Sequence, residues 1–535
     1  MKLRKHTFSV SLTLLSLVAV LFLSACGTRK NGIAAIGTPG PEFLIIHTND
    51  THSQIDAAKT KTGTEGGVVE RASLLELMRK SDPELLYLDA GDMVQGSPYF
   101  NIWNGKVEVE AMNHQGLIAS TFGNHEFDNG LAYLDTMLTQ ANFPILSCNY
   151  DCTGTILEPH VKKHLILECK GVKIGITGVT ANPDKLVFDK NWKGITYLDP
   201  SEAANEEAAI LRKEGCDIVI LLSHVGYAKA DTIGDRRIAR LSHDIDLIIG
   251  GHTHTNLENG VEVLNADGKP VILTQTGGKS NPIGKIQIHT IVSGKHKNGR
   301  KAYSIESIEC TKLHPTDYDL AGLGQDAAKL IAPYRNNLQA KMDIVVGRTE
   351  ADLFRFRPQS PLGNFISDAM REIASEIYGH KMDVAVMNIG GIRNDIKKGD
   401  ITLGDLYRIL PFENTVSVIE LKGRDLEAIV HAVEFKKLEA FSGLQVTLEQ
   451  QDGKYKATRI LVGGEPINPE RIYYVTTINY LAEGNDSMDA MKNALKNTDT
   501  GILIRDAIHD YIKSLTAKGE TINASLDDRV IEVAE

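Results

Sequence analysis

The sequence has 535 residues, of which 42% are apolar and 24% charged, and a formal net charge of −11. This length exceeds one ordinary hydrophobic core and predicts two or three globular domains. The acidic balance argues against a general binder of nucleic-acid polymers, because such proteins carry a basic surface. An anionic substrate would also need a local pocket of positive charge, since the overall field repels it.

Residues 1–26 have the pattern of an export signal, in which a basic start, MKLRKH, precedes the apolar run FSVSLTLLSLVAVLFLSA. The segment LSAC resembles the lipobox of bacterial lipoproteins, where Cys26 becomes the lipidated N-terminus. An uncleaved transmembrane anchor is the alternative, because the run is nearly long enough to span a bilayer. Either interpretation places the remaining chain outside the cytoplasm, in the periplasm or at the cell surface. Residues 27–41 have the composition of a flexible tether.

The other cysteines are odd in number, and their spacing matches no zinc module. An exported protein can form disulfides, and the first two of these cysteines are one conceivable pair. We assign no catalytic role to any of them. They are Cys148, Cys152, Cys169, Cys216 and Cys310.

From residue 43 onward, short apolar runs end in acidic, amide or imidazole side chains. The runs have the length and composition of buried strands, and helical patterns such as VVERASLLELMRK and EAANEEAAILRKEG lie between several of them. This alternation predicts an α/β layered domain whose ligands gather at the carboxyl ends of the strands. The segments are FLIIHTNDTH, ELLYLDAGD, STFGNHEFD, CDIVILLSH and IDLIIGGHTH.

Seven side chains at these ends are candidate metal ligands. Imidazole and carboxylate groups without thiolate suit Zn²⁺, Mn²⁺, Co²⁺ or Fe²⁺. One tetrahedral ion needs fewer ligands, whereas two ions about 3.5–4 Å apart that share a bridging carboxylate would use them all. Each segment alone is common, but the five in this order predict a two-metal centre. The candidates are Asp50, His52, Asp92, Asn124, His224, His252 and His254.

The order D-x-H, G-D, G-N-H-E, H and G-H-x-H resembles the calcineurin-like metallophosphoesterase superfamily, and TNDTHSQID, GNHEFDNG and FPILSCNY resemble its 5′-nucleotidase branch. The resemblance implies a four-layer β-sandwich flanked by helices over residues 42–315. The implied first metal site consists of Asp50, His52 and His254. The implied second site consists of Asn124, His224 and His252, with Asp92 as the bridge.

Within GNHEFD, His125 follows a ligand and should point beside the metal ions, towards the substrate. A histidinium there could stabilise charge on phosphoryl oxygens or protonate the leaving alkoxide. Asp128 is placed to accept from the imidazole and raise its pKa, and the family assigns this dyad the same task. We interpret Glu126 as structural support. The histidines that fit no part of the pattern are His114, His243 and His314.

The second half predicts a linker helix over residues 316–344, interrupted at Pro333, and a smaller α/β domain over residues 345–535. Its sequence contains no further metal-ligand cluster. Arg355 and Arg357 precede a predicted helix whose start favours negative charge. In an extended run both would lie on one side, so one of them could be a solvated arginine.

Asn388 and Arg393 flank a Gly-Gly turn whose backbone N–H groups could bind an anion, and arginine suits bidentate phosphate contact. A surface arginine beside a loop is the alternative. The segments RFR, LGN, N-x-GGIR and LPFEN resemble the 5′-nucleotidase C-terminal domain. The phosphate contacts that this resemblance implies are Arg355, Asn388 and Arg393.

The same resemblance implies that Phe412 and Tyr480 sandwich the base, a stacking worth about 1–3 kcal/mol per base, and that Asp486 binds the ribose hydroxyls. The chain departs from the family at residues 484–488, where GNDSM replaces GGDG followed by an aromatic residue. This departure leaves open the base preference and the preference for a nucleoside monophosphate.

The sequence is therefore identified as a member of the 5′-nucleotidase family in a bacterial lipoprotein form. The resemblance implies that a metal-bridging hydroxide hydrolyses nucleoside 5′-monophosphates to nucleoside and phosphate, at an interdomain site that closes around the linker. The alternatives are a 2′,3′-cyclic-nucleotide phosphodiesterase or a UDP-sugar pyrophosphatase, a thiosulfohydrolase, and a non-catalytic nucleotide-binding surface lipoprotein. The native metal pair and the oligomeric state stay open.

Overall fold

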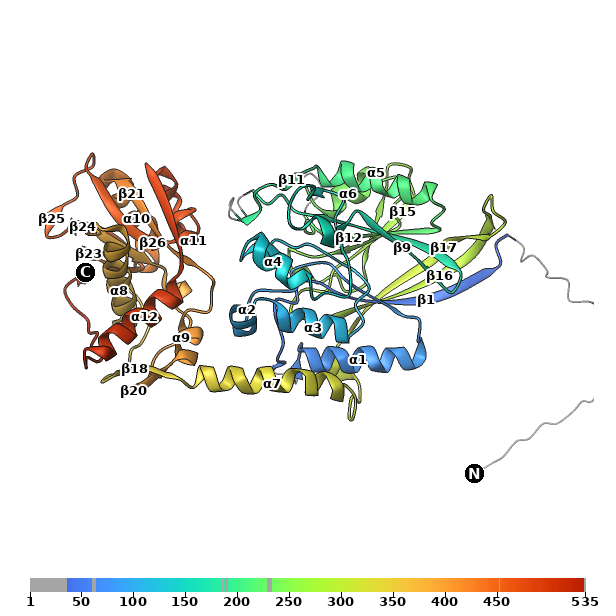
Figure 1. Ribbon diagram of the computed structural model, residues 1–535. Helices are drawn as coiled ribbons and strands as arrows, with labels where there is room; N and C mark the ends of the chain where they lie inside the picture. Colours follow the sequence, from blue (N-terminus) through green and yellow to red (C-terminus); the bar gives the residue numbers. More distant parts are fainter. Residues whose placement is uncertain are drawn as a thin grey trace, which may run out of the picture.

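The computed structural model describes residues 36–59, 64–184, 186–187, 191–228, 233–451 and 453–533. The chain forms two lobes, which we call the N-terminal and C-terminal domains. The long helix α7 (Gln325–Met342) runs along the N-terminal domain, and its C-terminal end leads into the C-terminal domain (Figure 1). The predicted signal segment lies outside the described residues. Strand β1 (Pro39–Thr48) begins within the predicted tether, because Pro39 already pairs with Ile291 of the neighbouring strand. The sheet therefore starts three residues earlier than we expected.

The N-terminal domain is built on two sheets. The first has the strand order β17-β16-β1-β4, and the second has the order β14-β15-β13-β12-β10-β9. The further strands of the first sheet are β4 (Leu86–Asp89), β16 (Ile283–Lys295) and β17 (Lys301–Leu313). The strands of the second are β9 (His164–Cys169), β10 (Val172–Thr180), β12 (Ile218–His224), β13 (Leu247–Gly250), β14 (Val261–Leu264) and β15 (Pro270–Thr274).

Strand β1 shows why the apolar runs are continuous rather than alternating. Phe43 and Ile45 pack between the two sheets, whereas Leu44 and Ile46 pack on the opposite face among helices. Both faces of the strand are covered from Phe43 to Ile46, so all four of these positions are apolar. The helices on this side are α1 (Val68–Ser81), α2 (Pro98–Trp103), α3 (Lys106–His114) and α4 (Leu131–Leu138).

The second sheet is covered on its outer face by α5 (Pro200–Lys213) and α6 (Asp235–Leu241) (Figure 1). The order helix, sheet, sheet, helix confirms the predicted four-layer fold. Strands β1 and β4 are parallel, as are β10, β12, β13 and β15. Their carboxyl ends, and the end of the short strand β5 (Ser120–Thr121), are where the predicted ligands follow.

Helix α7 differs from the predicted linker helix in two ways. It begins at Gln325, because Gly322 and Gly324 before it have φ of +80° and +67° and turn the chain. It also continues through Pro333, which we expected to interrupt it. A proline removes one helical hydrogen bond. Here Ala327 and Ile331 are buried against the N-terminal domain, and this packing holds the helix together.

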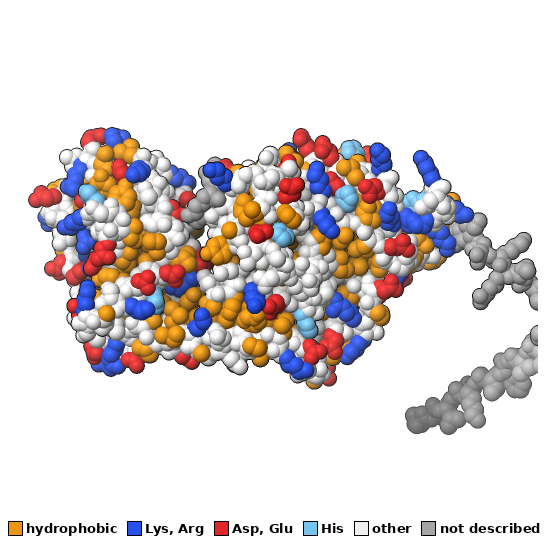
Figure 2. Space-filling model, in the orientation of Figure 1, with side chains coloured by type: hydrophobic (Ala, Val, Ile, Leu, Met, Phe, Trp, Pro, Cys, Tyr) orange, Lys and Arg blue, Asp and Glu red, His pale blue; other side chains and the backbone are white. Residues whose placement is uncertain are grey.

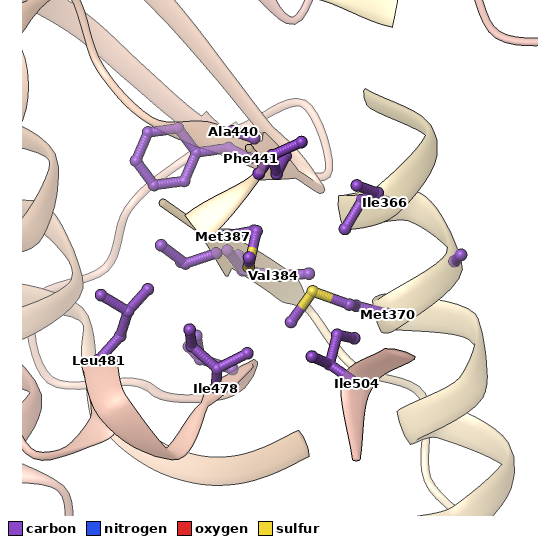
Figure 3. Close-up of a cluster of buried hydrophobic side chains, with 14 of the residues drawn as sticks. Ile366, Met370, Val384, Met387, Ala440, Phe441, Ile478, Leu481 and Ile504 are labelled. Atoms are coloured by element: carbon purple, nitrogen blue, oxygen red, sulfur yellow. The ribbon is translucent and has the colours of Figure 1, made fainter. Parts of the chain in front are cut away.

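The C-terminal domain has a five-stranded sheet in the order β22-β19-β26-β21-β27. Its core joins Ile366 and Met370 of α8 to Met387 of β19 and Ile478 of β26 (Figure 3). The strands are β19 (Val384–Met387), β21 (Thr415–Lys422), β22 (Ala440–Ser442), β26 (Ile472–Ile478) and β27 (Lys496–Leu503). The helices are α8 (Pro361–Tyr378), α9 (Leu403–Ile409), α10 (Gly423–Val433), α11 (Asn479–Ala482) and α12 (Ile504–Ala517).

Two smaller sheets complete this domain. One has the order β25-β24-β23-β28, and the other pairs β18 with β20. Their strands are β18 (Val345–Thr349), β20 (Gly399–Thr402), β23 (Leu444–Gln451), β24 (Lys454–Val462), β25 (Glu465–Pro466) and β28 (Val530–Val533).

Acidic and basic side chains are interspersed over the face of the molecule in Figure 2, so this face carries no large patch of a single charge. In the part of the chain that the structure describes, no helix combines the length and hydropathy needed to cross a membrane. The five described cysteines are buried free thiols, and the conceivable pair between Cys148 and Cys152 is not formed.

Candidate metal centre and substrate site

The predicted metal ligands converge in space, although they come from five loops. The loops follow β1, β4, β5, β12 and β13. Among the described residues, three groups bring their ligand atoms within 4.8 Å of one another. The groups are Asp50 with His52 and His254, Asp92 with His224 and His252, and Asp92 with His52 and His125.

Most of these residues have a left-handed backbone. The φ angles of Asp50, His52, Asp92, His252 and His254 are 49°, 45°, 54°, 72° and 49°. Residues with a Cβ rarely adopt this conformation, which costs about 1–3 kcal/mol and persists where the surrounding structure imposes it. The tight turns after the strands therefore carry strain at the point where the candidate ligands meet.

The first group is held by a buried asparagine that the sequence did not single out. His254 Nε2 lies 3.2 Å from Asp50 Oδ1 and 2.9 Å from His52 Nε2. Asn49 Nδ2 donates to Asp50 Oδ2 at 2.6 Å and to the Gly277 carbonyl at 2.7 Å. The carboxylate of Asp50 is thereby fixed in orientation before any ion binds.

In the second group, His224 Nε2 lies 3.0 Å from Asp92 Oδ2, and His252 Nδ1 lies 2.9 Å from Asn124 Oδ1. His224 Nδ1 contacts the Ala90 carbonyl at 2.7 Å. A carbonyl can only accept, so Nδ1 carries a proton and Nε2 is the nitrogen turned towards the other ligands.

The donor set fits two divalent cations. His224 Nε2 is buried and makes no hydrogen bond, despite its short distance to Asp92. Asp92 Oδ2 is also 3.9 Å from His52 Nε2, so this carboxylate lies between the two groups. Buried nitrogen and carboxylate atoms that converge in this way are the ligands that borderline divalent metals select.

The pKa values of several ionisable side chains in the centre are strongly shifted. Burial lowers the pKa of His52 and of His252 to about 4, which leaves both rings neutral with lone pairs to share. Burial alone would raise the pKa of Asp92, but His224 and His125 hold it well below its usual range. The centre thus keeps its carboxylate ionised at neutral pH.

The predicted dyad is formed beside these groups. His125 Nδ1 contacts Asp128 Oδ2 at 2.8 Å, and the backbone N–H of His125 donates to Asp92 Oδ1 at 2.9 Å. Burial lowers the pKa of His125, but Asp92 and Asp128 outweigh it and raise the pKa to about 9. An imidazolium therefore stands next to the metal-ligand cluster.

Glu126 points away from the dyad and binds backbone. Its carboxylate accepts from the N–H groups of Asp92 at 3.1 Å, Met93 at 2.8 Å and Gly123 at 2.5 Å. It therefore ties the loop after β4 to the loop after β5, as its interpretation as structural support requires. The unassigned histidines His114, His243 and His314 belong to none of the three groups.

In the C-terminal domain, Asn388 Nδ2 donates to Asp486 Oδ2 at 3.0 Å. Arg393 Nη1 donates to the Gly390 carbonyl at 3.1 Å, and its guanidinium carbon lies 5.9 Å from the centre of the Phe412 ring. Phe412 is 46% exposed and Tyr480 is 43% exposed. These side chains are therefore accessible, which a core position would not allow.

The two arginines of FRFR have different surroundings. Arg357 Nη2 binds both carboxylate oxygens of Glu439, at 2.7 and 2.8 Å, so it is a structural ion pair. Arg355 is exposed, and its backbone N–H donates to Asp395 at 2.9 Å. The sequence did not decide which of the two arginines is solvated. In the structure, Arg355 is the accessible one.

Sequence reasoning missed a lysine at the proposed sugar site. Lys436 Nζ lies 2.9 Å from Asp486 Oδ1 and 2.9 Å from Glu439 Oε1. Lys436 is far from Asp486 in sequence and belongs to an ordinary charged run, EFKKLE, so no local signal marks it. The predicted lipidation residue, Cys26, lies outside the described residues.

Comparison with known proteins places this geometry in a family. The calcineurin-like phosphoesterase family matches residues 43–256, and the family described as 5′-nucleotidase, C-terminal domain, matches residues 345–493. A snake venom 5′-nucleotidase from Crotalus adamanteus is 30% identical over 519 residues, which cover 89% of this chain and 86% of that protein. The chain belongs to the 5′-nucleotidase family.

Two further relatives extend the comparison. The trifunctional nucleotide phosphoesterase protein YfkN of Bacillus subtilis (strain 168) is 28% identical over 92% of this chain, which spans only 35% of that protein. The crystal structure of a 5′-nucleotidase precursor from Thermus thermophilus has 28% identity and a TM-score of 0.64, and covers 92% of this chain and 100% of that chain. As a member of the 5′-nucleotidase family, the protein is a dinuclear metallophosphohydrolase that cleaves phosphate esters with two divalent metal ions.

Proposed function

We propose that the protein hydrolyses nucleoside 5′-monophosphates to nucleoside and phosphate, at a site between its two domains. The observation that carries the proposal is the pair of ligand groups, Asp50 with His52 and His254 and Asp92 with His224 and His252, that lie beside the His125–Asp128 dyad. In this proposal residues 42–315 form the catalytic domain, residues 316–344 the linker and residues 345–535 the substrate-binding domain.

The seven converging side chains are the proposed metal ligands. Asn124 contributes a neutral oxygen, which adds no negative charge opposite a phosphate. Two divalent ions held by these residues would lower the pKa of a bound water and polarise the phosphoryl oxygens. The first ion is assigned to Asp50, His52 and His254, and the second to Asn124, His224 and His252, with Asp92 as the bridge.

His125 is the proposed acid of the reaction. Its Nδ1–H is held by Asp128, so the other ring nitrogen is free to donate a proton. The imidazolium stabilises negative charge on the transferring phosphoryl group and can protonate the leaving alkoxide. Asp128 keeps the ring in this orientation and favours its protonated form.

The C-terminal residues are the proposed substrate contacts. Arg393 and Arg355 supply the local positive charge that an anionic substrate needs, because the net charge of −11 repels it. Phe412 and Tyr480 offer exposed rings on which a base can stack. Asn388 completes the phosphate contacts, and Asp486 is assigned to the ribose hydroxyls.

The test is phosphate release from a panel of nucleotides, with and without a chelator, on protein lacking residues 1–26. We expect chelator-sensitive release that is fastest from a nucleoside 5′-monophosphate. Because the proposed metal ligands and substrate contacts come from different domains, closure around the linker should complete the site. A crosslink that locks the domains apart should then abolish turnover and leave the metal content unchanged. Turnover that survives the crosslink would contradict an interdomain site.

A second candidate is cleavage of 2′,3′-cyclic nucleotides or of diphosphates such as UDP-sugars. The ion pair between Lys436 and Asp486 favours the cyclic substrates, because the cation occupies one oxygen of the carboxylate assigned to the ribose hydroxyls, and a 2′,3′-cyclic nucleotide has neither of these hydroxyls free. The relative named as a trifunctional nucleotide phosphoesterase lends further support. Activity on a cyclic or diphosphate substrate far above that on AMP would replace our first choice.

We also infer that the protein is exported and anchored to a bacterial membrane through lipid on Cys26. The lipobox-like sequence LSAC supports this inference. Cys26→Ser should prevent lipid attachment. The protein should then be found as an unmodified precursor or in a soluble form, and no longer as the lipidated form in the membrane fraction. Membrane retention of this variant with the same mobility on gels as the parent would contradict lipidation.

A further inference from the structure

The loop formed by residues 410–414 carries Phe412 and is held in place by hydrogen bonds within the C-terminal domain. It joins α9 to β21. Arg505 Nη1 donates to the Leu410 carbonyl at 3.2 Å, and the Arg393 backbone N–H donates to the Ile409 carbonyl at 2.9 Å. The exposed ring of Phe412 is therefore presented by a fixed segment.

Glu413, the next residue, neutralises a buried charge. Arg505 is 1% exposed, and its guanidinium carbon lies 4.0 Å from the centre of the Tyr407 ring. An arginine does not lose its proton inside a protein, so a buried guanidinium needs an anionic partner. Arg505 Nη2 finds that partner in Glu413 Oε1, at 2.9 Å.

The same oxygen of Glu413 reaches the other domain. Asn101 Nδ2, on α2, donates to Glu413 Oε1 at 2.5 Å. Helix α2 is fixed to the metal-ligand loop, because its N-cap Ser97 contacts Ser53 Oγ at 2.8 Å and Ser53 directly follows His52. One carboxylate oxygen thus connects the core of the C-terminal domain to a helix that borders the metal centre.

Helix α2 also borders the loop of the dyad. Asn129, which follows Asp128, donates from Nδ2 to Asn104 Oδ1 at the C-terminal end of α2, at 3.3 Å. The Phe412 loop therefore meets the N-terminal domain at a helix that also contacts the loop of His125 and Asp128.

We propose that Glu413 is a positioning residue for the substrate site: through Arg505 and Asn101 it sets the Phe412 loop at a defined place against the catalytic domain. The assignment of Phe412 to the base rests on the proposed function, whereas the bridge between the domains does not. Glu413 itself makes no contact with the reacting atoms in this proposal.

The test is a double-mutant cycle across the contact in the full chain. Asn101→Asp replaces the donor by a second carboxylate facing Glu413. Adding Glu413→Gln to that variant restores a donor and an acceptor in reversed order across the domains. Because Glu413→Gln also removes the carboxylate that neutralises Arg505, the cycle includes Glu413→Gln alone as its second single variant. Asn104→Asp, at the C-terminal end of the same helix, is the matched control: it adds the same charge and keeps the side-chain oxygen that accepts from Asn129. Asn101→Ala removes the donor without adding charge.

Two measurements separate positioning from chemistry. Energy transfer between dyes attached at Ala132 and Lys513 through unnatural amino acids reports the interdomain distance without any substrate. Steady-state kinetics compare AMP with p-nitrophenyl phosphate, which has no base or ribose.

We expect Asn101→Asp to shift the distance distribution and to raise KM for AMP about tenfold, an effect of the size of one lost charge-assisted hydrogen bond. Its kcat/KM for p-nitrophenyl phosphate and its metal content should stay at the parent values. Glu413→Gln alone should also shift the distance, because it breaks both the contact with Asn101 and the ion pair with Arg505. The double variant should lose less than the sum of the two single variants. Asn101→Ala should fall between the parent and Asn101→Asp, and Asn104→Asp should match the parent.

An unchanged distance distribution in Asn101→Asp, or equal shifts in Asn101→Asp and Asn104→Asp, would overturn the proposal. A distance shift that the double variant reverses, in a protein that releases no phosphate from any nucleotide, would instead support the bridge and overturn the proposed function. The two failures are therefore distinguishable.

Discussion

His125 is the side chain on which the proposed chemistry depends most directly. It touches Asp128 and the Asp92 carboxylate but is not needed to hold an ion in the assignment above. His125→Ala should lower kcat for phosphate release about 100-fold to 10,000-fold, the usual contribution of a general acid. Steady-state kinetics and elemental analysis of the same sample check this prediction.

The control for this variant is His114→Ala, which removes an exposed histidine outside the ligand groups and should keep the parent rate. Full phosphate release by His125→Ala with both ions retained would show that another group protonates the leaving alkoxide.

Glu126 is the residue through which two ligand loops are joined. Glu126→Ala leaves three buried N–H groups without their acceptor. Because each unmet buried donor costs about 1–3 kcal/mol and the loops can relax in part, the free energy of unfolding should fall by about 2–4 kcal/mol. Metal affinity should fall about 10-fold to 100-fold, as for other residues that orient ligands.

Urea unfolding and calorimetric metal titration check the Glu126 prediction. Glu84→Ala, at an exposed position on the same domain, should change neither quantity. Loss of activity in Glu126→Ala at normal metal affinity and normal stability would mean that Glu126 takes part in the reaction itself.

At the residue scale, the sequence pattern pointed to the ligands and to Glu126 as a support, but it did not identify supports whose partners are distant in sequence. Asp50 and His52 are two residues apart at the end of an apolar run, a pattern that points to metal binding once four similar runs follow. Asn49 and Lys436 act through partners distant in sequence, Gly277 and Asp486. Only folding brings such pairs together, so no spacing rule could identify them.

At the scale of elements, Asp217 joins the second sheet to the β16–β17 hairpin. Its side chain is buried and binds Arg300 Nη1 at 2.6 Å, His296 Nε2 at 2.7 Å and the backbone N–H of Tyr303 at 3.1 Å. Burial raises the pKa of Asp217, but Arg300 and His296 outweigh it and lower the pKa overall. Asp217→Asn should reduce the free energy of unfolding by about 2 kcal/mol at pH 7.

The pH dependence of this effect follows from the lowered pKa. Asp217 contributes its stability above its unfolded pKa of about 3.9 and loses it as the pH falls through the lower folded value. The gap between wild type and Asp217→Asn should therefore be full at pH 5 and shrink below about pH 4. Asp326→Asn, in an exposed pair with Lys329, should leave the free energy of unfolding close to that of wild type at every pH, because solvent screens the pair. A gap that widens at low pH would contradict the assignment.

Helices and strands were predictable where packing is uniform along the element. Residues 43–46 of β1 are all apolar because both faces of the strand are covered there, and α5 begins at Pro200 after its N-cap Asp199. The linker helix was less predictable. Its sequence contains Pro333, and only contact of Ala327 and Ile331 with the N-terminal domain shows why the helix continues.

At the scale of the whole molecule, the metal ions should contribute to stability. Ions that bind the folded state alone add about 2.7 kcal/mol when present at 100 times their dissociation constant. Chelation should therefore lower the unfolding temperature of the protein by about 5–10 °C and abolish activity, and Zn²⁺ or Mn²⁺ should restore both. Scanning calorimetry with elemental analysis of remetallated protein checks this prediction, and two ions per chain are expected.

Asp92→Asn is the informative variant for the metal prediction, because Asp92 belongs to two of the ligand groups. It should bind fewer than two ions per chain and show a smaller thermal shift on chelation. Binding of a single ion by the remetallated wild-type protein would contradict the two-metal centre.

The sequence by itself determined the family, the layered α/β class and the seven candidate ligands. Each ligand follows a buried apolar run, and this local pattern can be recognised in the sequence without knowledge of the fold. Only the tertiary structure decided which of Arg355 and Arg357 is accessible, that Lys436 pairs with Asp486, and that Glu413 joins the two domains. These outcomes depend on contacts between segments far apart in the chain, and burial and charge pairing fix them only after the chain has folded.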